Sequence, residues 1–91
     1  MTPRLLRIRG RVQGVGYRAW LMEEATAAGL SGWVRNRADG SVEALLAGEE
    51  DAVGAVLLAA RRGPPGARVD EIEENFGPLP EEPGFHKRPT L

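Results

Sequence analysis

The chain has 91 residues, a length that suits one small two-layer domain with a single hydrophobic core. Its 12 Lys and Arg nearly balance its 13 Asp and Glu, and a net charge of -1 argues against general binding to nucleic acid or membrane surfaces. The lack of cysteine excludes disulfides, thiol nucleophiles and thiolate metal sites, and a single histidine, His86, excludes sites built from several histidines.

Alternating apolar and basic side chains predict a half-buried first strand, with Leu6, Ile8 and Val12 on one face. A glycine-rich loop follows at residues 13–17. Apolar residues at helical spacing then predict a helix over residues 17–28.

The next segment has the pattern of a β-hairpin. Residues 32–37 predict a second strand, and residues 41–46 predict a third strand that runs antiparallel to it. Asp39-Gly40 between them is a strong signal for a tight hairpin turn.

A second helix is predicted to begin near Glu49, because three acidic residues there suit the positive end of a helix dipole. Its core-facing stripe repeats at helical spacing, and Gly63-Pro64-Pro65-Gly66 ends it. A fourth strand is expected at residues 67–76, with a bulge or a late start because its apolar residues depart from strict alternation. Prolines then precede a short last strand at residues 85–88.

The order β-α-β-β-α-β plus a terminal strand predicts an α+β fold, the ferredoxin-like sandwich. Two helices would cover one face of a four- or five-stranded antiparallel sheet in one domain, residues 1–91. Basic residues gather early in the chain and acidic residues late. We therefore expect ion pairs across the sheet, an attraction for a small anion, or both.

The loop and the start of the first helix resemble a cradle for a phosphate group. Glycines let the backbone turn and leave its N–H groups uncovered. Arg18 would lie on the first helical turn, where the dipole disfavours a cation unless an anion binds nearby. Its neighbours one turn along, Leu21 and Met22, offer no ion pair.

Interpretations of the loop without a phosphate-binding role remain open. A glycine-rich turn without any ligand is one of them. A Walker A loop is excluded by sequence, and a dinucleotide site is weakly supported because Asp39 falls in a hairpin turn. Asn36 could likewise be an ordinary polar residue at a strand end. Trp33 is expected to pack, and His86 and the acidic residues 70–74 to be solvated.

Two segments together resemble the acylphosphatase family. Residues 10–18 resemble its first motif, G-x-V-Q-G-V-x-[FY]-R, and residues 32–48 resemble its second, G-[FYW]-V-x-N-x3-G-x-V-x5-G. The resemblance covers nearly the whole chain. It implies an enzyme that hydrolyses acyl phosphates to a carboxylate and phosphate without a metal or organic cofactor.

Carried onto this chain, the family's catalytic pair falls on Arg18 and Asn36. The resemblance implies that the phosphate-binding amides belong to Gln13, Gly14, Val15, Gly16, Tyr17 and Arg18. The last strand departs from the family pattern, because Phe85-His86-Lys87-Arg88 is more polar than usual.

The implied partners are a small-molecule acyl phosphate and phosphate or a similar anion, with no nucleic acid and no membrane. No apolar signal segment is present, so we expect a cytoplasmic protein, and a compact monomer. Alanine, glycine, proline and arginine are frequent, which suits a GC-rich bacterial genome. The alternatives are a non-catalytic anion-binding module, a domain of a larger carbamoyl-transfer maturation protein, and an RNA-binding sheet. The chain has few aromatics for the last of these.

Overall fold

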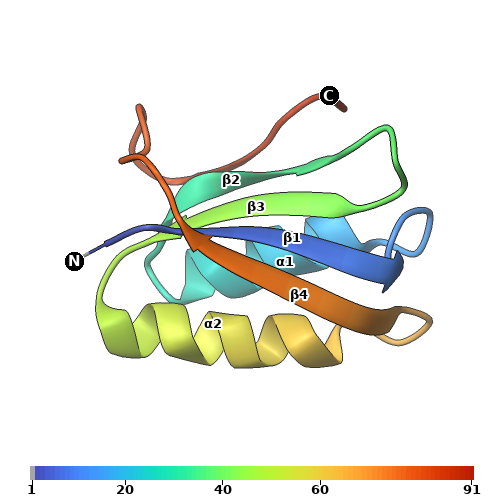
Figure 1. Ribbon diagram of the computed structural model, residues 1–91. Helices are drawn as coiled ribbons and strands as arrows, with labels where there is room; N and C mark the ends of the chain where they lie inside the picture. Colours follow the sequence, from blue (N-terminus) through green and yellow to red (C-terminus); the bar gives the residue numbers. More distant parts are fainter. Residues whose placement is uncertain (1) are drawn as a thin grey trace.

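Two helices cover one face of a five-stranded sheet in the computed structural model, which describes residues 2–91 (Figure 1). This arrangement confirms the predicted α+β fold and element order. In chain order the elements are β1 (Arg4–Arg11), α1 (Tyr17–Ala27), β2 (Ser31–Asn36), β3 (Val42–Ala47), α2 (Glu50–Arg62), β4 (Arg68–Phe76) and β5 (Phe85–Lys87).

The strands lie side by side in the order β4-β1-β3-β2-β5. The prediction of a purely antiparallel sheet is wrong at one edge, because β5 pairs with β2 in parallel. Strand β4 finishes at the end of the sheet where β2 begins. Residues 77–84 cross to the other edge at that same end, so β5 has to start beside Gly32 and run with β2.

The hydrophobic core lies between the sheet and the helices. Alternation along each strand sends one set of side chains toward the helices, and the register aligns these sets across the sheet. Leu6 faces Ala44, and Ala44 also faces Val34. These three side chains are fully buried, as are Leu21 and Ala25 of α1.

The predicted irregularity in the fourth strand is confirmed. The β1–β4 register shifts between Arg9 and Gly10, so that Asp70 is the extra residue on β4. A bulge of this kind bends its own strand, here β4, and increases the local twist beside the end of β1.

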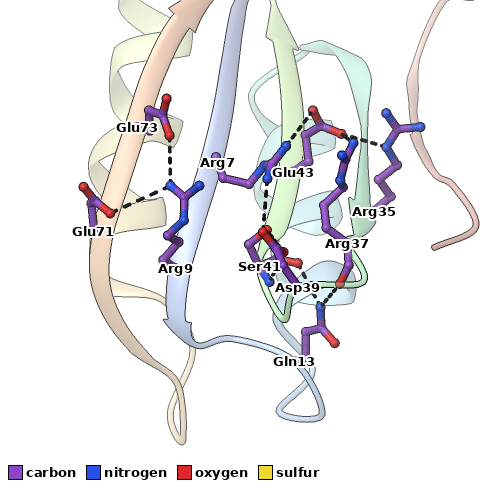
Figure 2. Close-up of polar contacts among 10 residues, drawn as sticks. All are labelled: Arg7, Arg9, Gln13, Arg35, Arg37, Asp39, Ser41, Glu43, Glu71 and Glu73. Atoms are coloured by element: carbon purple, nitrogen blue, oxygen red, sulfur yellow. Dashed lines mark hydrogen bonds and ion pairs between the residues drawn. The ribbon is translucent and has the colours of Figure 1, made fainter. Parts of the chain in front are cut away.

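Ion pairs join the basic first strand to the acidic fourth strand, which confirms the expected ion pairs across the sheet. Arg9 Nη1 lies 2.9 Å from Glu73 Oε1 and 3.8 Å from Glu71 Oε1 (Figure 2). The hydrogen bond from Arg9 lowers the pKa of Glu73. These groups are exposed to solvent, so each pair adds little to stability.

A buried hydrogen bond connects the two helices. The Tyr17 hydroxyl, at the start of α1, donates to the Ala60 carbonyl near the end of α2 at 2.7 Å. In an uninterrupted helix that carbonyl would accept from residue 64, but Pro64 has no N–H. Tyr17 therefore satisfies a carbonyl that the helix itself leaves without a donor.

Within residues 2–91, neither helix is long and apolar enough to cross a membrane.

We expect Tyr17→Phe to lower the free energy of unfolding by about 1–3 kcal/mol, because the buried Ala60 carbonyl loses its donor. Burial raises the pKa of Tyr17. The native protein should therefore lose stability as pH rises above about 10, the ordinary tyrosine pKa, and the variant should lack this contribution. Urea denaturation of both proteins at neutral and alkaline pH measures both effects. If the native protein were equally stable at both pH values, the role assigned to the Tyr17 hydroxyl would be wrong.

Candidate active site

The loop between β1 and α1 presents main-chain N–H groups without acceptors. Gly14 and Gly16 take left-handed backbone conformations, with φ of 75° and 78°. Gly16 caps α1 without a side-chain hydrogen bond, and the first helical bond runs from Trp20 N–H to the Gly16 carbonyl at 3.1 Å. Among the residues that the structure describes, the N–H groups of residues 14–19 donate to no carbonyl. They are free to bind an anion.

The two helices differ in how their N-terminal ends are charged. Helix α2 has Glu50 and Asp51 in its first turn and basic residues in its last, as predicted. Helix α1 has no acidic residue in its first turn and has Arg18 there instead. In the described part of the chain no carboxylate lies within ion-pair distance of Arg18. An anion at the loop would complement both the helix dipole and the guanidinium.

A small hollow of about 120 Å³ lies beside this loop. Its size suits a small anion and is below that of pockets for larger organic ligands. The hollow is lined by Val12, Gly14, Gly16, Tyr17, Arg18, Ala19 and Lys87. Three of the predicted phosphate-binding residues besides Arg18 therefore meet in it, whereas Gln13 and Val15 do not line it. The buried Tyr17 side chain is committed to Ala60, which leaves its main-chain N–H for a ligand.

Asn36 ends β2 on the side of the sheet that faces the helices. It pairs with Val42 of β3, and its carbonyl accepts from Leu91 N–H at 3.1 Å. Its side-chain Oδ1 is buried and has no hydrogen-bond partner within residues 2–91. A buried acceptor of this kind calls for a donor, and a water molecule can supply one.

The Gln13 side chain connects the loop to the hairpin that carries Asn36 (Figure 2). Its Nε2 donates to the carbonyls of Arg37 and Ser41, at 2.8 Å each. Sequence analysis did not foresee this contact, since nothing local to Gln13 indicates it. The side chain is thereby committed to the hairpin, and only the main chain of Gln13 remains for an anion.

A cluster of arginines around Glu43 lies on the opposite face of the sheet. Buried Glu43 accepts from Arg35 Nε at 2.8 Å and Arg37 Nη1 at 3.1 Å, and Arg7 Nη2 lies 3.8 Å away (Figure 2). The two arginines that flank Asn36 are therefore neutralised away from the loop. This cluster also went unpredicted, because it depends on the strand register.

The hairpin turn is held by Asp39. Its carboxylate accepts from Ser41 Oγ at 2.6 Å and from Ser41 N–H at 3.0 Å. The hydrogen bond from the Ser41 hydroxyl is the main cause that lowers the pKa of Asp39. Asp39 thus serves the turn, which explains its position there without a ribose ligand.

The remaining polar clusters show no arrangement for a metal. Across residues 2–91, no group of three or more His, Cys, Asp or Glu is placed to hold a metal ion. His86 is exposed, and its Nε2 lies 2.8 Å from the Pro83 carbonyl.

Comparison with known proteins points to one family. The family model described as Acylphosphatase matches residues 5–87. The chain is 55% identical over 91 residues to an acylphosphatase of Rhodospirillum rubrum, with all of both chains covered, and 54% identical over 90 residues to one of Acidiphilium cryptum, with 99% of each covered. The crystal structure of acylphosphatase from Bacillus subtilis superposes with a TM-score of 0.92 at 36% identity, covering 97% of this chain and 99% of that one.

We expect Gln13→Ala to loosen the loop from the hairpin. Loss of two hydrogen bonds should lower the free energy of unfolding by about 1–2 kcal/mol and weaken the binding of inorganic phosphate. Gln13→Glu should be worse, because a carboxylate cannot donate to the two carbonyls. Titration with phosphate and amide hydrogen exchange at residues 14–16 measure the effect. Unchanged phosphate affinity in both variants would show that the connection does not shape the loop.

Proposed function

The chain belongs to the acylphosphatase family and hydrolyses acyl phosphates to a carboxylate and phosphate, and from this we propose that residues 13–18 bind the phosphoryl group while Asn36 holds the attacking water. One observation carries the proposal. Arg18, without an acidic partner among the described residues, lines the same hollow as the glycines whose loop leaves its N–H groups free.

Binding of the phosphoryl group follows from the loop geometry. The free N–H groups of the loop donate to its oxygens, and the Arg18 guanidinium donates two parallel hydrogen bonds to the same group. Phosphoryl transfer depends mainly on such positioning and charge stabilisation. A lysine at this position would keep the charge but lose the planar fork.

Asn36 is suited to hold water rather than to activate it. Its buried, unpartnered Oδ1 accepts one O–H of a water molecule, which directs a lone pair of the water toward phosphorus. The water oxygen bonds to phosphorus as the bond from phosphorus to the acyl oxygen breaks. The carboxylate leaves without needing a proton, and the proton of the water passes to a phosphoryl oxygen, because an amide cannot accept it.

The proposal extends to the setting of the enzyme. We propose that residues 1–91 act as one monomeric domain in the cytoplasm, with no metal or organic cofactor. The relative from Rhodospirillum rubrum supports the domain extent, since the match covers both chains in full. Light scattering on the purified protein would test the monomer.

We expect Arg18→Ala to lower kcat/KM for benzoyl phosphate by about 10²–10³-fold, because the transition state loses its fixed cation. Arg18→Lys should fall between this variant and the native enzyme. The assay is run with and without a chelator, and the matched control is Arg4→Ala, at the end of β1 opposite to the loop, where the arginine makes a long ion pair with Glu74 at 3.8 Å. Native-like turnover by Arg18→Ala would overturn the assigned role. A native protein that binds phosphate without turnover would be the anion-binding module instead.

We expect Asn36→Ala to lower kcat strongly while the inhibition constant of phosphate changes little, because the side chain contacts water and not the bound anion. Asn75→Ala on the distant edge strand β4 is the control with the same chemical change. Equal loss of turnover and of phosphate inhibition would show that Asn36 binds the phosphoryl group.

A further inference from the structure

The single lysine of the chain lies at the rim of the site. Lys87 of β5 lines the hollow that Arg18 and the loop glycines form. It belongs to β5, an edge strand of the sheet with an unusually polar sequence. Its side chain is exposed, and within residues 2–91 it makes no ion pair or hydrogen bond.

The strand register explains how Lys87 reaches this place. Buried Phe85 faces the helices, and alternation sends Lys87 to the same side. Lys87 also pairs with Val34, one step of the ladder from Asn36 on that side. Arg88 points to the other face, where its guanidinium carbon lies 5.3 Å from the centroid of the Trp33 ring.

Binding of the phosphoryl group does not require a second cation at this rim. The loop N–H groups and Arg18 already provide donors for its oxygens, and no carboxylate lines the hollow to neutralise Lys87. A lysine is a point charge on a long flexible stem, suited to an anion whose position varies. If the phosphoryl group fills the hollow of about 120 Å³, the acyl part of the substrate must extend past its rim.

We infer that Lys87 is a specificity-determining residue that favours acyl phosphates with a second anionic group, a carboxylate or a phosphate, on the acyl side. The inference rests on the proposed function. It predicts a preference among substrates that share the same reaction centre. Lysine supplies this preference by attraction between partly exposed charges, so the effect should be modest and should fall with salt.

The test compares kcat/KM for benzoyl phosphate, 4-carboxybenzoyl phosphate and 4-(phosphonomethyl)benzoyl phosphate. We expect Lys87→Met to lower the ratio of each charged substrate to benzoyl phosphate roughly fivefold. Lys87→Arg, which keeps the charge, should keep the native ratio. Salt at 0.5 M, where screening is strong, should bring the ratio of the native enzyme toward that of Lys87→Met. The matched control is Arg88→Met, which removes the same charge from the other face and should shift the ratio less than about twofold.

The outcomes separate this inference from the proposed function. If Lys87→Met lowers kcat/KM equally for all three substrates, Lys87 binds the phosphoryl group and the inference is overturned. An unchanged ratio, or an equal shift in Arg88→Met, also overturns it. Failure of the native enzyme to hydrolyse benzoyl phosphate would instead contradict the proposed function. A difference between the carboxylate and the phosphonate substrates identifies which anion Lys87 prefers.

Discussion

The hydrogen bonds from Gln13 to the hairpin carbonyls are the constraint on which the site depends. The loop follows β1 and Asn36 ends β2, but β3 lies between these two strands in the sheet. No direct ladder therefore joins the two motifs. Gln13 bridges the gap by donating to Arg37 on one side of the hairpin and Ser41 on the other. The relative position of loop and asparagine is thus set before a ligand arrives, which reduces the ordering cost of binding.

The distribution of charge over the two faces of the sheet also prepares the site for an anion. On the open face Glu43 gathers three arginines, and on the edge Arg9 meets two glutamates. These contacts neutralise most of the basic first half of the chain. On the helix side the start of α1 keeps an uncapped N-terminus beside Arg18. Helix α2 shows the complete set of stabilising end charges that α1 lacks, and such local departures from good helix design commonly mark functional sites.

The elements that sequence analysis predicted well depend on local signals. Helical spacing, the acidic start of α2 and the Asp39-Gly40 turn act over a few residues, so their elements appear where they were expected. The direction of β5 depends on where residues 77–84 cross the sheet, and short-range patterning does not encode that path. The contacts of the Gln13 and Glu43 side chains and the position of Lys87 depend on the strand register, which brings together residues that are far apart in the sequence. The residues of the loop and Arg18 by themselves predict a site for an anion. The role of Asn36 as the second catalytic residue follows only from the resemblance to a family.

The acidic character of β4 has a consequence for how copies of the chain meet. This strand forms one edge of the sheet, and an edge offers unpaired backbone groups to any other strand. Its Asp70, Glu71, Glu73 and Glu74 are exposed. Two β4 edges that approached one another would bring these carboxylates together, and the repulsion opposes extension of the sheet into an aggregate. Glu71, Glu73 and Glu74, which also pair with arginines of β1, thus protect the edge during folding and at high concentration.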